Sequence, residues 1–129
     1  AAGRFLERAA KYSKERVTFG KPICENQAIA FKLAEMATEI DVARAMLYNT
    51  ARMSDNGLPF SKEATMTKMF CSEMCVRVCD MGLQIMGGYG LCDEYQVERM
   101  YRDAKLLTIG EGTSEICRMV VGRFVLKEY

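Results

Sequence analysis

Glu111 is the residue of this sequence best placed to do chemistry. It stands between Gly110 and Gly112, after an apolar run at 106–109 and before a polar stretch typical of a helix start. Flanking glycines leave a carboxylate a clear path to a substrate proton, and partly apolar surroundings help it act as a general base. The alternative is structural, since a glutamate just before a helix also favours the helix dipole. The spacing alone leaves both interpretations open.

Two other segments share this character. They are "RVTFGKP" at 16–22 and "QIMGGYG" at 84–90, and like 109–116 each combines glycine with polar or charged groups at a predicted helix end. Any one of them has a purely structural interpretation, because glycine ends helices and serine or threonine starts them. Three such segments in one small helical domain predict a common ligand.

The composition excludes several classes of function. The sequence contains no histidine, which removes Ser-His and Cys-His nucleophiles and most zinc sites. The 18 Lys and Arg nearly balance the 17 Asp and Glu, and Trp is absent. With no basic stripe, nucleic acid and anionic membranes are not expected as partners. No apolar stretch approaches the ~20 residues that a membrane span needs.

The six cysteines include no C-x-x-C pair, which argues against zinc-ribbon and thioredoxin-like sites. Cys71, Cys75 and Cys79 recur every four residues and therefore share one face of a predicted helix. We interpret them as buried free thiols that let a neighbouring helix approach, with a metal or redox site as the alternative. Free thiols indicate a reducing compartment.

The apolar spacing predicts helices and no strands. Alternating steps of three and four residues, broken by glycine and proline, are typical of helices that pack in a bundle. Asn26 and Ser61 are expected as N-caps, and Gly57 as a left-handed C-cap. Short loops between long helices predict an all-α, antiparallel up-down four-helix bundle with an additional short helix. The expected helices cover 2–16, 27–54, 61–86, 94–105 and 114–127.

Four segments resemble, in order, the C-terminal helical domain of the acyl-CoA dehydrogenases. They are "ERVTFGKPICENQAIAFKLAEMATEIDVAR", "QIMGGYG", "YRDAK" and "IGEGTSEI", and the likeness runs from about residue 4 onward. Members of this family have an N-terminal helical domain, a middle β domain and a C-terminal four-helix bundle. They use FAD to form a trans double bond between Cα and Cβ of an acyl-CoA thioester. Residues 1–129 then form a single domain of a longer protein, and the chain alone is expected to have little activity.

The resemblance implies a role for each residue around Glu111. In many members the matching glutamate removes the α-proton while hydride passes to flavin N5, and its backbone N–H helps to hold the thioester carbonyl. Some branched-chain and long-chain members take the base from an earlier helix. Gly112 would lie against the substrate thioester. Gly110 stands where relatives often carry tyrosine, which widens the pocket and leaves the acyl chain undefined.

The resemblance also implies a set of cofactor contacts. Arg16, Thr18 and Phe19 match a segment that reaches the FAD of a neighbouring subunit, with Arg16 on the pyrophosphate. Tyr89 replaces a small or amide residue, and many relatives carry glutamine in place of Glu115. No metal is expected. The remaining residues implied in cofactor binding are Gln27, Gln84, Gly87, Gly88, Thr113 and Glu115.

The partners implied by the resemblance are an acyl-CoA substrate, identical subunits in a dimer or tetramer, and electron-transferring flavoprotein as acceptor. The implied location is the cytoplasm of a bacterium or the mitochondrial matrix of a eukaryote. Two alternatives stay open at this point. One is an acyl-CoA oxidase of the same superfamily, and the other is a non-catalytic helical module that serves oligomerisation.

Overall fold

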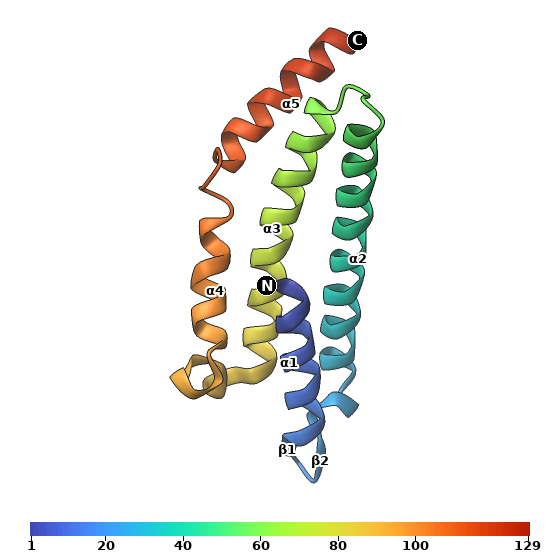
Figure 1. Ribbon diagram of the computed structural model, residues 1–129. Coiled ribbons are helices and arrows are strands. Elements are labelled where there is room, and N and C mark those ends of the chain that lie inside the picture. Colours follow the sequence, from blue (N-terminus) through green and yellow to red (C-terminus); the bar gives the residue numbers. More distant parts are fainter.

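Four helices of the chain run alternately up and down, and a fifth continues past them (Figure 1). The computed structural model describes all residues, 1–129. The helices are α1 (Ala2–Glu15), α2 (Gln27–Asp55), α3 (Ser61–Met86), α4 (Val97–Leu106) and α5 (Ser114–Glu128). The expected all-α antiparallel bundle is confirmed. The expected helix bounds agree to within one residue except at the start of the fourth helix, which was expected at 94.

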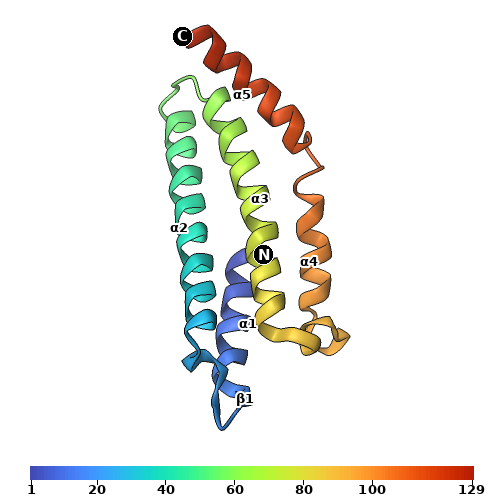
Figure 2. The ribbon, with the colours of Figure 1, turned by 180° about the vertical axis from the view of Figure 1, so that it is seen from behind.

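Helix α3 is the centre of the bundle, and each of the other four helices packs on it. It lies between α2 and α4, with α1 over the groove between α2 and α3 (Figures 1 and 2). Phe5 and Met36 are fully buried against it. Gly82 permits the close approach, because a Cβ at this position would lie 2.4 Å from Cδ1 of Phe5. The small residue on α3 therefore sets how closely α1 docks.

The helix ends agree with expectation in part: Asn26 is the N-cap of α2, as expected, but its side chain makes no capping hydrogen bond. Gly57 takes the left-handed conformation (φ 67°) after α2. Its N–H donates to the Ser54 carbonyl at 3.0 Å and the Leu58 N–H donates to the Met53 carbonyl at 3.0 Å, which completes a Schellman motif. Ser61 is the first helical residue of α3 rather than its N-cap, a position that Phe60 occupies.

A small hairpin departs from the strand-free expectation. Strands β1 (Val17–Thr18) and β2 (Lys21–Pro22) pair antiparallel after α1. Phe19 and Gly20 form the two-residue loop with φ of 52° and 82°, the backbone of a type I′ turn. Two-residue strands carry no periodic pattern, so the sequence could not reveal them.

Short 3-10 turns fill two of the connections between helices. The turn η1 (Ile23–Glu25) leads into α2, and η2 (Gly87–Leu91) and η3 (Asp93–Tyr95) join α3 to α4. Gln96 has a φ of 54°, which interrupts helical geometry just before α4. This left-handed residue explains why α4 begins at Val97, three residues later than expected.

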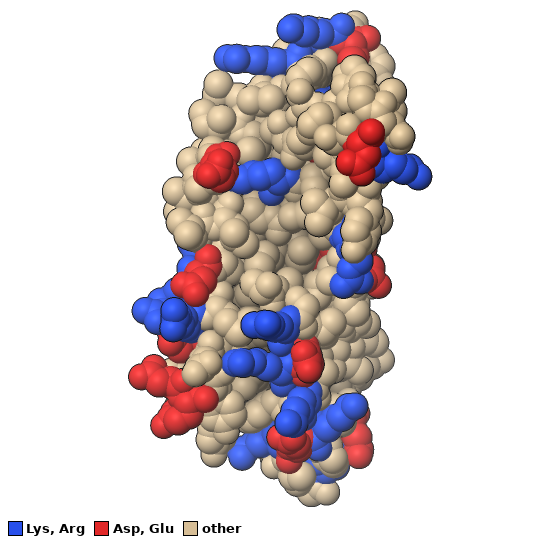
Figure 3. All heavy atoms as spheres, in the orientation of Figure 1, with Lys and Arg blue, Asp and Glu red and all other residues tan.

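Charged side chains of both signs are interspersed over the face of the bundle shown in Figure 3. This agrees with a net charge of +1. None of the helices combines the length and hydropathy required of a membrane-spanning segment.

Candidate functional site

A hollow of about 470 Å³ lies at the end of the bundle that carries the hairpin. Arg16 and Thr18, at the end of α1, line it together with Gly87 and Gly88, at the end of α3. Figure 1 shows the hairpin and the end of α3 at the same end of the molecule. The fold thus brings together two of the three glycine-containing segments singled out in the sequence.

This hollow places the guanidinium of Arg16 near the accessible backbone of Gly87 and Gly88. Gly87 ends α3 with a φ of 58°, a conformation that is unfavourable for residues with a side chain. A Cβ at Gly87 or Gly88 would meet no atom within 4 Å, so the space beside this backbone is open. The Arg16 guanidinium is exposed and takes part in none of the ion pairs of the chain. A guanidinium next to accessible glycine backbone suits a phosphate-containing ligand.

An aromatic cluster holds this arginine. The guanidinium carbon of Arg16 lies 5.3 Å from the ring centroid of Tyr89. Tyr89 in turn lies 6.2 Å from Tyr12 and 5.7 Å from Tyr95, measured between ring centroids. Burial raises the pKa of Tyr12, although the charge of Arg16 opposes the shift. The structure therefore gives Tyr89 a contact with Arg16 that sequence reasoning missed.

Glu111 lies in the turn between α4 and α5, exposed to solvent. Its φ is 57° and that of Gly112 is 94°, so both residues have left-handed backbone. The turn is closed by the Gly110 N–H on the Leu106 carbonyl at 2.8 Å and by the Ser114 N–H on the Thr108 carbonyl at 3.0 Å. Neither the carboxylate nor the backbone N–H of Glu111 has a partner within the chain.

The first turn of α5 follows directly. Thr113 is its N-cap, and the Thr113 hydroxyl accepts a hydrogen bond from the Ile116 N–H at 3.3 Å. Hydrogen bonds from its own backbone N–H and from Thr113 lower the pKa of Glu115. Thr113 and Glu115 line a second hollow, of about 390 Å³, with Lys105 and Arg118. An ionised Glu115 offers a ligand only hydrogen-bond acceptors.

The hollow lined by Arg16 and the turn that carries Glu111 lie far apart. The turn that holds Glu111 lies at one end of α4 and η2 at the other, as both ribbon views show. The ten residues of α4 span ~15 Å at the usual helical rise. Gln27 and Gln84 are exposed near the first hollow without lining it, and Phe19 is fully exposed at the hairpin tip. A compact ligand therefore cannot touch all three segments of one chain.

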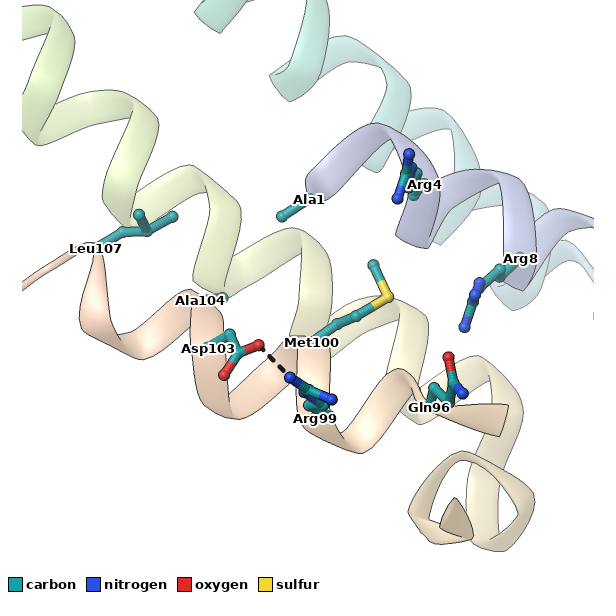
Figure 4. A pocket seen from close by; sticks show the side chains of 9 residues that line it. All are labelled: Ala1, Arg4, Arg8, Gln96, Arg99, Met100, Asp103, Ala104 and Leu107. Atoms are coloured by element: carbon teal, nitrogen blue, oxygen red, sulfur yellow. Dashed lines mark ion pairs between the residues drawn. The ribbon is translucent and has the colours of Figure 1, made fainter. Parts of the chain in front are cut away.

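A third hollow, of about 450 Å³, lies between α1 and α4 (Figure 4). Arg4 and Arg8 of α1 face α4 across it, and Arg99 pairs with Asp103 at 3.8 Å along α4. The Arg8 guanidinium donates to the Tyr95 carbonyl at 2.7 Å, which ties α1 to η3 just before α4. None of the site residues expected from the sequence lines this hollow.

The cysteine stripe lies within the bundle. Cys75 and Cys79 are buried, Cys71 is half-buried, and all three are free thiols, as expected. Burial raises the pKa of Cys71, whose thiol donates to the Ala43 carbonyl of α2 at 3.7 Å. No group of three or more His, Cys, Asp or Glu side chains is arranged to hold a metal ion.

Lys68 is a further residue that sequence reasoning did not single out. Its ammonium group, on α3, donates a hydrogen bond to the backbone carbonyl of Gly112. The two residues are 44 positions apart in the sequence. No motif signals such a contact, because it depends on how the turn before α5 packs on α3.

The fold is thus an antiparallel helical bundle that carries a hollow lined by Arg16 at one end of α4 and an unpaired glutamate at the other. The chain belongs to the acyl-CoA dehydrogenase family, since residues 1–126 match the family model described as "Acyl-CoA dehydrogenase, C-terminal domain".

Curated relatives and solved structures agree with this assignment. The chain is 55% identical over 122 residues to a "probable acyl-CoA dehydrogenase YngJ" of Bacillus subtilis, covering 95% of this chain and 32% of the relative. It is 49% identical over 123 residues to the caffeyl-CoA reductase-Etf complex subunit CarC of Acetobacterium woodii, with coverage of 95% and 32%. Butyryl-CoA dehydrogenase from Megasphaera elsdenii superposes with a TM-score of 0.94 at 45% identity, covering 97% of this chain and 33% of that one. The chain spans about a third of the length of the curated relatives it matches.

Proposed function

We propose that this chain is the C-terminal bundle of a flavin-dependent acyl-CoA dehydrogenase, in which Glu111 removes the α-proton of an acyl-CoA thioester. One observation carries the proposal. Glu111 is exposed and unpaired, and a left-handed backbone holds it between two glycines in a member of this family. A general base needs this freedom from ion pairs, because a partner would compete with the substrate proton.

Free backbone N–H groups in the same turn are proposed to bind the thioester carbonyl while Glu111 removes the proton. The N–H groups of Glu111, Gly112 and Thr113 have no partner within the chain. An α-proton next to a thioester is only weakly acidic, and its removal becomes feasible when fixed donors hold the carbonyl oxygen where charge develops. The Glu111 N–H is the donor we assign to that oxygen. Base and donor then belong to one residue, which fixes their relative geometry.

The first hollow is the proposed contact with FAD. The exposed guanidinium of Arg16 and the open backbone of Gly87 and Gly88 fit a pyrophosphate and its flanking groups. When bound, FAD supplies the acceptor for the hydride that leaves the β-carbon. Thr18 lines the same hollow. The remaining residues proposed to contact the cofactor are Phe19, Gln27, Gln84, Thr113 and Glu115.

The distance between the two regions supports an oligomeric site. Because α4 separates the first hollow from Glu111, we propose that the two regions of one chain serve two different cofactor molecules. Phe19, fully exposed at the hairpin tip, is placed to reach a second copy. Leu47 of α2 and Leu126 of α5 are 54% and 83% exposed and offer apolar area for contacts between copies. We therefore propose that the protein assembles as a dimer or tetramer.

The proposed contacts with the acyl-CoA substrate involve Gly110 and Gly112. Gly112 has a φ of 94°, which L-residues rarely adopt, so no side chain blocks the approach of the thioester. Gly110 leaves room where relatives often carry tyrosine, and the acyl group is not restricted there. Electron-transferring flavoprotein is the proposed electron acceptor. A relative named as a subunit of a reductase-Etf complex supports this choice.

The test is Glu111→Gln in the full-length protein. We expect the variant to retain FAD but to lose reduction of the flavin by acyl-CoA substrates, measured by the bleaching of the flavin absorbance under anaerobic conditions. Butyryl-CoA is the first substrate to try, with longer and branched acyl-CoAs beside it. Glu63→Gln, in the first turn of α3, is the matched control and keeps the normal rate. Normal flavin reduction by the Glu111→Gln variant would show that another group is the base.

An oxidase is the second candidate. The prolyl acyl carrier protein oxidase AnaB shares this fold with a TM-score of 0.93 at 35% identity. Comparing reoxidation of the reduced protein by electron-transferring flavoprotein and by O₂ separates the two activities. A full-length protein that binds no FAD would instead support a non-catalytic oligomerisation module. Residues 1–129 alone are expected to show little turnover with added FAD.

A further inference from the structure

The turn that carries Glu111 lies between α4 and α5, and Lys68 provides its one hydrogen bond from an element other than these two helices. The Lys68 side chain is half-buried on α3, and its ammonium group donates to the Gly112 carbonyl. It takes part in none of the six ion pairs of the chain. Its charge is therefore directed at the backbone of the turn rather than at a carboxylate.

The turn has little else to define its conformation. The two hydrogen bonds that close it are donated by the N–H groups of Gly110 and Ser114. Between these residues, no backbone N–H is bonded within the chain. Glu111 nevertheless has a left-handed backbone, which is unfavourable for a residue with a side chain and persists only where the surroundings enforce it. A charge-assisted hydrogen bond to the next carbonyl is a direct way to enforce it.

We infer that Lys68 is a positioning residue for the proposed reaction: by holding the Gly112 carbonyl, it fixes the left-handed conformation of Glu111. This conformation sets the direction of both the Glu111 carboxylate and its backbone N–H. Lys68 itself touches neither proton nor thioester. The inference rests on the proposed function, because it concerns the geometry of the base assigned there.

The experiment uses the full-length, FAD-loaded protein and two variants of Lys68. Lys68→Met keeps most of the length of the side chain and removes the donor, whereas Lys68→Arg keeps a charged donor. Small displacements of a catalytic group can cost up to ~100-fold in rate, so we expect Lys68→Met to lower the limiting rate of flavin reduction by about 10- to 100-fold. We expect Lys68→Arg to recover most of this loss.

Two readouts separate positioning from a merely structural role. The apparent Kd of the substrate should stay within a factor of ~3, since the lost interaction acts on the chemical step rather than on ground-state binding. The isotope effect with α-deuterated substrate should be retained or increase in Lys68→Met, because proton removal then limits the rate. Lys62→Met, on the same helix, removes an ion pair with Glu128 instead and should leave the limiting rate unchanged.

A normal limiting rate for Lys68→Met would overturn the inference, as would an equal loss in Lys62→Met. If Lys68→Met does not accumulate as a folded flavoprotein, Lys68→Leu, which also lacks a donor, is measured against Lys68→Arg. Equal rates for these two would then overturn the inference, and a slower Lys68→Leu supports it. A failure of the proposed function is distinguishable, because it shows as normal flavin reduction by Glu111→Gln whatever the Lys68 variants do.

Discussion

Substitution of Gly82 by alanine tests how α1 is docked on α3. The added Cβ would lie 2.4 Å from Cδ1 and 2.7 Å from Cε1 of Phe5, and 3.2 Å from Cε of Met36. Carbon atoms in contact are normally ~3.5–4.0 Å apart, so the ring must move by about an ångström. Phe5 and Met36 are fully buried, so neither can relieve the clash by turning into solvent. The variant therefore strains the contact between the two helices.

The expected magnitude is the difference between two effects. Alanine in place of glycine inside a helix contributes up to ~1 kcal/mol of stability. Overpacking a buried site costs ~1–3 kcal/mol, and the fully buried ring puts this site near the upper value. We expect a net loss of about 1–2 kcal/mol in the free energy of unfolding. Gly122→Ala, in α5, is the matched control, because a Cβ there meets no atom within 4 Å. That variant should be more stable than the unmodified protein.

Urea unfolding followed by far-UV circular dichroism measures both variants. A double-mutant cycle adds Phe5→Ala, which alone should cost ~3–5 kcal/mol because it leaves a cavity. In that background Gly82→Ala should be neutral or stabilising, since the cavity accepts the new methyl group. If Gly82→Ala stabilises the protein as Gly122→Ala does, the described packing of Phe5 on α3 is wrong.

Two further predictions concern charges near the proposed site. Burial would raise the pKa of Glu73, but the hydrogen bonds and charges around it, led by the hydrogen bond from Arg118, together outweigh this effect and the pKa is lowered. The pair therefore stabilises the fold at pH values above the ordinary pKa of a glutamate, and this stabilisation is lost as the pH falls through the lowered pKa. Glu73→Gln should thus cost ~0.5 kcal/mol near neutral pH for this half-exposed pair and nothing once the carboxylate is protonated, measured by urea unfolding at both pH values. Tyr89→Leu should speed release of FAD from the full-length protein by about two- to fivefold, because a cation–π contact with Arg16 at a partly exposed site is worth ~0.5–1 kcal/mol. Tyr89→Phe keeps the ring and should release FAD at the normal rate; equal release by both variants would contradict the contact.

The helices could be predicted because their signals are local. Apolar residues at helical spacing marked four of the five within about a residue, and Gly57 marked the end of α2. The signals failed where structure depends on a few residues. The hairpin has strands too short to show a period of two. Gln96 takes a left-handed conformation, which a glutamine residue does not predict. Phe60 holds the N-cap that Ser61 was expected to fill.

The candidate site could be predicted only in part. Glu111 stood out because glycines flank it, and the segments of Arg16 and Gly87 stood out because each combines glycine with polar or charged groups at a predicted helix end. Their spatial relation could not be predicted, since it depends on the length and direction of α4. Lys68 and Tyr89 were missed because their partners, Gly112 and Arg16, are distant in sequence and meet only when the helices pack.

The separation of Arg16 from Glu111 along α4 has a genetic consequence. On the proposed two-copy arrangement, each active site takes its glutamate from one chain and its arginine from another. A chain defective in Arg16 and a chain defective in Glu111 would then be complementary, because a mixed dimer of the two rebuilds one intact site out of two. Both defects in the same chain, paired with an unmodified copy, would leave every site with one lesion. Two inactive alleles could thus restore activity in one cell, whereas a doubly defective allele would impair its normal partner.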